Sequence, residues 1–163
     1  MMQHFNVLFL CTGNSARSIM AEAILNQKGH AYFTGYSAGS QPAGRVHPEA
    51  LKQLLGAHMP TEGLHSKSWA EFAGPDAPTI HFVFTVCDRA AAEVCPIWPG
   101  HPLTARWSVP DPAAVVGTPE QIERAFFEAF TILDRRITLF LSLPLAKLER
   151  QVIQSEIDRI GRL

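Results

Sequence analysis

The chain carries little charge, few cysteines and no long apolar run, and each shortage excludes a class of protein. Charged residues make up 18% of the 163 residues and the formal net charge is -1. This balance gives no reason to expect nucleic acid or an anionic membrane as a partner. No apolar run approaches the roughly 20 residues of a membrane-spanning helix. The first residues also lack a basic segment, so we expect no signal peptide.

Three cysteines are an odd number and too few for a disulfide framework. Without an export signal, this count predicts reduced thiols and a cytoplasmic protein. The length suits one domain with a single core, and a hydrophobic content of 47% is typical of a globular chain. The chemistry of this chain therefore has to be sought in a few residues.

The most informative segment runs from Cys11 to Ser18 and reads Cys-Thr-Gly-Asn-Ser-Ala-Arg-Ser. An apolar run over 7–10 predicts a strand before it, and a helical pattern follows it. A tight loop at a helix N-terminus aims backbone N–H groups at one point, and Arg17 adds a planar fork for two oxygens. We therefore predict an oxyanion site formed by Cys11, Thr12, Gly13, Asn14, Ser15, Ala16, Arg17 and Ser18.

Cys11 is placed to attack the central atom of a bound oxyanion. An ordinary cysteine has a pKa of about 8.5, and lowering it by about 2 units requires roughly 2.7 kcal/mol. We expect the helix N-terminus, the loop N–H groups and Arg17 to lower the pKa of Cys11, with Ser18 donating a hydrogen bond to the sulfur. The alternative is a buried structural cysteine before a helix that Ser18 caps.

Strand and helix signals alternate along the chain. Strands are expected over 6–10, 33–37, 80–86 and 103–107, and helices over 18–28, 48–55 and 118–143, with a short helix near 68–72. This alternation predicts an α/β fold, a single domain with a doubly wound parallel sheet of about four strands flanked by helices. Ligands bind at the carboxyl edge of such sheets, where the first loop lies.

The stretch 7–23 resembles the low-molecular-weight protein tyrosine phosphatase superfamily and, more closely, the arsenate reductases built on that fold. The similarity continues at 37–39, 47–50, 65–68 and 111–112. The resemblance implies a phosphatase-type anion loop after the first strand. It also implies that Cys11 is the nucleophile and that Arg17 binds the oxyanion.

A second amphipathic stretch follows Pro144. The usual chain of the family that this sequence resembles ends near Pro144 or soon after it. The apolar side of the stretch is expected to comprise Leu145, Leu148, Val152, Ile153, Ile157 and Ile160. We therefore divide the chain into a phosphatase-like catalytic domain, 1–144, and a C-terminal helical extension, 145–163. The extension can pack on its own chain or form a homodimer, and both readings stay open.

Cys87 follows the third expected strand, and a parallel sheet places it at the same edge as Cys11. Cys95 comes eight residues later, about 12 Å away along a regular helix, whereas a disulfide needs Cα atoms within about 7 Å. From the residues alone, the alternative that Cys87 and Cys95 are two inert buried cysteines stays open. The resemblance implies the thioredoxin-coupled relay, in which Cys11 reacts first and Cys87 and Cys95 form the final disulfide.

Asp111 lies between Pro110 and Pro112, which can hold its carboxyl group over the anion loop as a general acid. A plain turn is the alternative, and the match to the family's Asp-Pro favours the acid. In phosphatases of the superfamily aromatic residues follow this Asp-Pro. Here the residues at 113–115 are Ala-Ala-Val, so no aromatic clamp is evident.

Other polar residues receive lesser roles. In some reductases of this family a potassium ion lies among side chains that match Asn14, Glu22 and Ser37, so this ion is a candidate cofactor. No covalently bound cofactor is expected. Lys67 and Arg106 are expected to be solvated surface residues.

The sequence therefore predicts reduction of arsenate to arsenite for arsenic detoxification, with thioredoxin or a similar dithiol protein as the external reductant. A low-molecular-weight phosphatase acting on phosphotyrosine or a small phosphate ester is the first alternative, with Cys11, Arg17 and Asp111 in the same roles. A non-catalytic oxyanion-binding regulatory module is the second.

Overall fold

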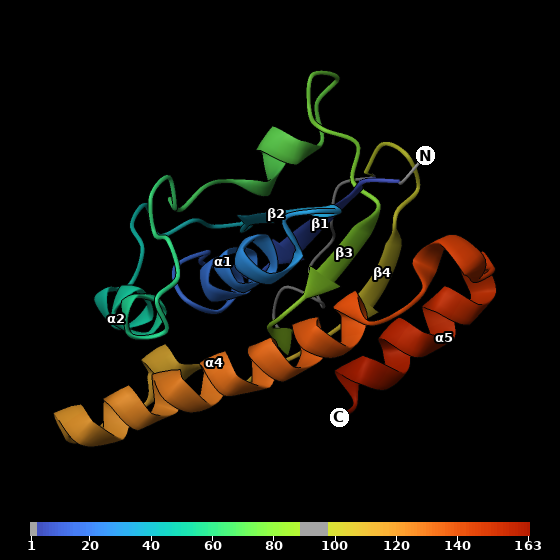
Figure 1. Cartoon of the computed structure of the whole chain (residues 1–163). Coiled ribbons are helices and arrows are strands. Elements are labelled where there is room, and N and C mark those ends of the chain that lie inside the picture. The colour runs from blue at the N-terminus through green and yellow to red at the C-terminus, as the bar shows by residue number, and fades with distance from the viewer. Residues whose placement is uncertain (1–2, 89–97) are drawn as a thin grey trace.

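The computed structural model describes residues 3–88 and 98–163. Within them, four parallel strands form one sheet in the order β2-β1-β3-β4 (Figure 1). The strands are β1 (Phe5–Leu10), β2 (Phe33–Ala38), β3 (Phe82–Thr85) and β4 (Leu103–Arg106). The expected α/β fold with a parallel sheet is confirmed, and every strand lies within one or two residues of its expected bounds.

The α-helices and the shorter 3-10 helices connect these strands. The α-helices are α1 (Arg17–Gly29), α2 (Pro48–Gly56), α4 (Pro119–Leu141) and α5 (Arg150–Gly161). The 3-10 helices are η1 (Trp69–Phe72), η2 (Pro112–Ala114) and η3 (Leu145–Lys147). None of the helices in the described ranges is long and apolar enough to cross a membrane.

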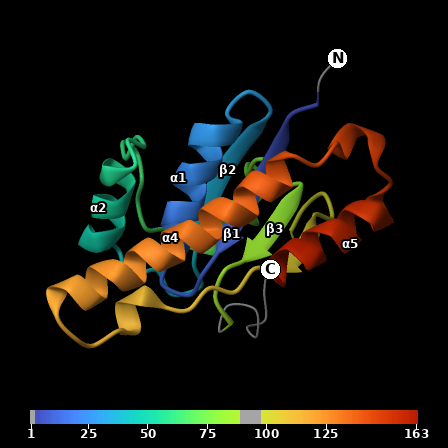
Figure 2. The same cartoon turned by 60° about the horizontal axis from the view of Figure 1, so that its bottom comes forward.

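The two faces of the sheet bury different residues because side chains alternate along a strand. Val7 and Phe9 of β1 belong to the larger core cluster, which α1, α4 and α5 also form. Leu8 and Leu10 point to the opposite face, where they pack with Phe72 of η1. Figure 1 and Figure 2 show α1, α4 and α5 together on one side of the sheet.

The parallel register brings the ends of three strands to one place. Leu10 pairs with Thr85, and the amide of Val86 donates to the Leu10 carbonyl at 2.9 Å. Cys11 directly follows Leu10 and Cys87 directly follows Val86, so the two cysteines leave the sheet side by side. The Val109 amide donates to the Val86 carbonyl at 3.0 Å, which adds the segment after β4 to the same edge.

The C-terminal segment packs on its own chain. Ile153, Ile157 and Ile160 are buried in the main core, and the Trp107 Nε1–H donates to the Ile157 carbonyl at 3.0 Å. Val152, expected on the apolar side, is 41% exposed. The apolar residues of this stretch spread over more of the helix circumference than the face that contacts the core, so Val152 is left facing solvent.

Candidate active site

The loop after β1 forms one wall of a cavity of about 840 Å³ at the carboxyl edge of the sheet. All loop residues from 11 to 17 line it, together with Gln41, Cys87, Asp88, residues 108–111 and Ala113. The cavity therefore brings together Cys11, Arg17, Asp111 and Cys87, four of the five residues expected to carry the chemistry. The fifth, Cys95, lies outside the described residues.

Asn14 determines the shape of the loop. It is fully buried and has a φ of +46°, in the left-handed region that few side chains tolerate. Its amide donates to Ser18 Oγ at 2.8 Å, and its Oδ1 accepts from the Lys67 amide at 2.8 Å. No side chain caps the first turn of α1, so the alternative in which Ser18 caps this helix is not supported.

Gly39 allows the loop to lie against the end of β2. A Cβ at this position would lie 2.4 Å from the Thr12 carbonyl oxygen and 2.6 Å from that of Cys11. Any other residue would therefore push the loop away from the sheet. The Gly39 match in the sequence thus has a structural reason, which is the close approach of two backbone segments.

Cys11 and Cys87 form a buried pair of sulfur atoms. Their exposed fractions are 6% and 3%, and no disulfide joins them in this structure. The hydrogen bond with Cys87 and then burial raise the pKa of Cys11, against the opposing influence of the Arg17 charge and the Gly13 amide. The expected lowering of this pKa is therefore wrong for this arrangement, because the hydrogen bond with Cys87 and burial both favour the protonated thiol.

Arg17 and Asp111 face each other across the cavity. Arg17 Nη2 lies 3.6 Å from Asp111 Oδ2, while its Nη1 donates to the Val109 carbonyl at 2.8 Å. The other Asp111 oxygen accepts from the Ala113 amide at 3.0 Å and so caps η2. The side chain of Asp111 is 44% exposed, so its carboxyl group is open to the cavity and to solvent.

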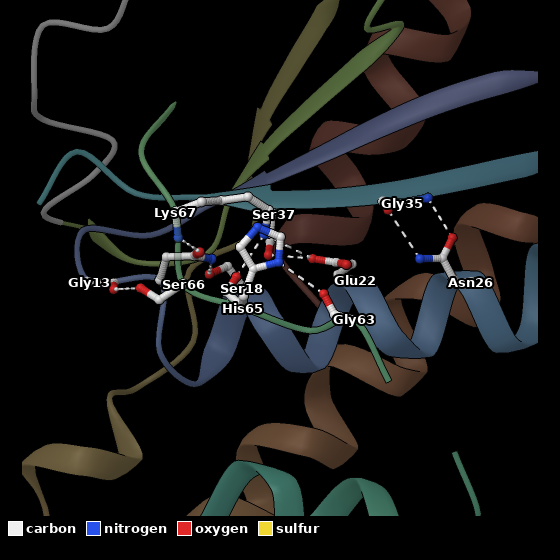
Figure 3. Close-up of polar contacts among 11 residues, drawn as sticks. Gly13, Ser18, Glu22, Asn26, Gly35, Ser37, Gly63, His65, Ser66 and Lys67 are labelled. Carbon is white, nitrogen blue, oxygen red and sulfur yellow. Dashed lines mark hydrogen bonds and ion pairs between the residues drawn. The ribbon is translucent and has the colours of Figure 1, made fainter. Parts of the chain in front are cut away.

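Behind the loop lies a buried polar cluster, the loop brace, which consists of Asn14, Glu22, Ser37 and Lys67. Figure 3 labels the last three of these residues. Ser37 Oγ donates to Glu22 Oε1 at 2.6 Å, and Lys67 Nζ lies 3.7 Å from the same oxygen. Burial raises the pKa of Glu22, and the Ser37 hydrogen bond and the Lys67 charge offset only part of this rise. The expected potassium ligands thus lie together, with the Lys67 ammonium group among them.

The expected surface role of Lys67 is wrong, since this residue is only 8% exposed. Its ammonium group donates to the His65 carbonyl at 2.8 Å in addition to its ion pair with Glu22. Arg106 does lie at the surface, with 68% of its side chain exposed. Arg106 lies in the strand expected over 103–107, whose alternation places it on the exposed face, whereas Lys67 lies in an irregular segment without a periodic pattern that reports burial.

The sequence did not single out several further residues that line the cavity, among them Gln41 and Ser108. The Gln41 amide donates to the Thr12 carbonyl at 3.0 Å, and Ser108 Oγ donates to Asp88 Oδ1 at 2.5 Å. Both residues lie in irregular segments. The only sequence signal for these two residues is that each lies shortly after the end of an expected strand, and this signal is too weak to single them out.

A nucleophilic cysteine and an arginine in one loop before a helix, with an acid across the cavity, define the phosphatase-type oxyanion enzymes. Comparison with known families agrees with this class. The chain belongs to the family described as low molecular weight phosphotyrosine protein phosphatase, whose family model matches residues 6–154.

A curated relative from Bacillus licheniformis, named arsenate reductase, is 35% identical over 123 residues, covering 75% of this chain and 84% of the relative. Among solved structures, the low molecular weight protein tyrosine phosphatase from T. tengcongensis matches with a TM-score of 0.64 at 23% identity, covering 82% of this chain and 98% of that one. A thioredoxin-dependent arsenate reductase from Corynebacterium glutamicum matches with a TM-score of 0.56 at 23% identity. It covers 84% of this chain and 63% of that longer chain. At these identities the two structures show the shared fold.

Proposed function

We propose that this protein reduces arsenate to arsenite and takes the electron pair from its own thiols. The observation that carries the proposal is the second buried sulfur, Cys87, against Cys11 in the oxyanion cavity. Phosphate-ester hydrolysis needs a nucleophile, an anion-binding arginine and an acid, but no second thiol. The naming of the Bacillus licheniformis relative supports the same reading.

In the first step arsenate, a tetrahedral oxyanion like phosphate, binds to the loop N–H groups and Arg17. The Cys11 sulfur attacks arsenic while Asp111 gives a proton to the departing oxygen, which leaves as water. Because the pKa of Cys11 is raised, its thiol proton has to leave for the attack. The bound arsenate, itself a base at neutral pH, can accept this proton.

In the second step the Cys87 sulfur attacks the Cys11 sulfur and the bond between sulfur and arsenic breaks. Its electron pair remains on arsenic, which passes from As(V) to As(III) and leaves as arsenite. A disulfide now joins Cys11 and Cys87, so two thiols have been oxidised for one arsenate reduced. The proximity of Cys87 to Cys11 and to Thr12, whose Oγ1 lies 3.8 Å from the Cys87 sulfur, supports this order.

In the third step Cys95 attacks Cys87, which frees Cys11 as a thiol and leaves a Cys87–Cys95 disulfide for an external dithiol to reduce. We propose thioredoxin as that dithiol. The name of the Corynebacterium glutamicum structure, which has the same fold, supports this partner. The thioredoxin step and the whole detoxification role belong to the cytoplasm, where thiols stay reduced.

A phosphatase acting on a small phosphate ester is the second candidate, because Cys11, Arg17 and Asp111 serve both reactions. Among the described residues that line the cavity none is aromatic, so nothing there would flank a phosphotyrosine ring. This observation favours a small substrate. A module that only binds oxyanions would leave Cys11 unmodified.

The deciding experiment mixes fully reduced protein with one equivalent of arsenate, without any reductant, and maps disulfides by mass spectrometry. We expect one arsenite per chain and a Cys87–Cys95 disulfide. The Cys95→Ser variant should stop after one turnover with a Cys11–Cys87 disulfide, while Cys87→Ser should form neither disulfide. Intact thiols in the wild-type protein after prolonged incubation would exclude the reductase and favour the phosphatase.

A further inference from the structure

The loop brace contains an internal positive charge at the place where a cation was expected from outside. Lys67 Nζ lies 3.7 Å from Glu22 Oε1, and the side chains of the two residues are 7% and 14% exposed. Figure 3 shows the Lys67 side chain reaching past Ser37 toward Glu22 of α1. A buried ammonium group this close to a carboxylate satisfies the charge of that carboxylate.

One side-chain oxygen of each expected potassium ligand already has a partner. Glu22 Oε1 accepts from Ser37 Oγ at 2.6 Å and faces the Lys67 ammonium, while Asn14 Oδ1 accepts from the Lys67 amide at 2.8 Å. Potassium is bound by several oxygens that replace its water shell. A potassium ion here would also lie next to a buried charge of the same sign. The residues present therefore do not fit a potassium ion.

Lys67 is also coupled to the anion loop through its backbone. The backbone amide of Lys67 donates to Asn14 Oδ1 and so orients this side chain, and Asn14 Nδ2 in turn donates to Ser18 Oγ at the start of α1. The neighbouring Ser66 Oγ donates to the Gly13 carbonyl at 3.3 Å, so two consecutive residues hold the loop from behind. One residue thus positions Glu22 through its side chain and Asn14 through its backbone.

We propose that the Lys67 ammonium group is a built-in cation that positions the anion loop, so that this protein binds oxyanions without potassium. An ammonium group and a potassium ion carry the same charge and are close in size. Attachment to the chain gives the ammonium a high effective concentration at the site, which a free ion reaches only at high salt. The inference concerns the affinity of the loop for an oxyanion and holds for a reductase or a phosphatase alike.

The test measures binding of inorganic phosphate by calorimetry in potassium chloride and in choline chloride at equal ionic strength. The wild-type affinity should agree within about twofold between the two salts, and Lys67→Ala in choline chloride should bind about tenfold more weakly. Potassium should restore most of the loss in this variant, because the shortened side chain leaves room for the ion. Lys67→Met, which fills the same space without a charge, should lose affinity and gain nothing from potassium.

Lys28→Ala is the matched control, since Lys28 likewise forms an ion pair that involves α1, with Asp134 at 2.6 Å, but its side chain is 36% exposed. It should bind phosphate as the wild type does in both salts. A severalfold increase in wild-type affinity with potassium would overturn the proposal, and this measurement decides even if the Lys67 variants do not fold. An unchanged affinity in Lys67→Ala, or no phosphate binding by the wild type, would overturn it too. Phosphate binding requires no electron transfer, so failure of arsenate reduction is a separate result.

Discussion

The two sides of the anion loop each carry an ion pair, and the pairs differ in how far water reaches them. In the loop brace, Lys67 and Glu22 have side chains 7% and 14% exposed, with further hydrogen bonds on both partners. On the cavity side, Arg17 is 13% exposed but Asp111 is 44% exposed. The buried pair holds a shape, because breaking it leaves an uncompensated charge, whereas the open pair can exchange its partner for a substrate at low cost.

The largest expected effect tests the cavity side. Asp111→Asn removes the proton donor and should slow arsenate-driven disulfide formation roughly 100-fold or more, while phosphate affinity changes little. Rapid-quench mass spectrometry measures this rate. Asp88→Asn is the matched control, because Asp88 lines the same cavity but its side chain is 82% exposed. If Asp111→Asn and Asp88→Asn react equally fast, Asp111 is not the acid.

An intermediate effect sharpens the contrast between buried and open contacts. Ser37 and Ser108 each donate a hydrogen bond to a carboxylate, at 2.6 Å to Glu22 and at 2.5 Å to Asp88. Ser37→Ala should lower the free energy of unfolding by about 1.5–3 kcal/mol, as is usual for a hydrogen bond to a charged group. Ser108→Ala should cost less than about 0.5 kcal/mol, because water replaces the lost partner of an exposed carboxylate. Urea denaturation measures both variants, and equal losses would show that burial does not separate the two sides.

The smallest expected effect is a shift in a pH profile. The hydrogen bond that the Cys11 thiol donates to Cys87 is the largest cause that raises the pKa of Cys11, so Cys87→Ala should move that pKa downward. The rate of Cys11 alkylation by iodoacetamide, followed by mass spectrometry, should then reach its midpoint at lower pH than in the wild type.

The same shift has a consequence for stability. A thiol that keeps its proton to higher pH in the folded chain stabilises the fold below the unfolded pKa, about 8.5, and this contribution is lost as pH rises further. The wild type should therefore lose stability above that pH more steeply than Cys87→Ala. A Cys87→Ala profile identical to that of the wild type would show that the two sulfurs do not interact.

Local and periodic signals predicted the strand, the anion loop and the helix around Cys11, and they predicted the helix from residue 118, where the structure shows a capping box of Thr118 and Gln121 at the start of α4. The placement of Cys87 beside Cys11 followed from the parallel sheet, because strand ends of one sheet share an edge. The helix expected over 48–55 forms as α2, and His47 Nδ1 accepts from the Glu49 amide at its start.

The direction in which the pKa of Cys11 shifts could not be predicted from local signals in the same way. The helix terminus and Arg17 are visible in the sequence, and both favour the thiolate. The opposing contribution comes from a residue 76 positions away whose sulfur reaches Cys11 only after the sheet has formed. Long-range contacts of this kind determine the sign of a pKa shift without leaving a local signal.

By itself, the sequence determined the fold class and predicted the oxyanion loop with its candidate residues, because these depend on strand and helix periodicity and on a short contiguous motif. Only the tertiary structure decided that Lys67 is buried against Glu22, that Arg17 pairs with Asp111 and that α5 packs on its own chain. Each of these contacts joins segments without periodicity or far apart in the chain. Their formation depends on which charges and apolar faces the packed sheet leaves without water, and that is a property of the whole fold.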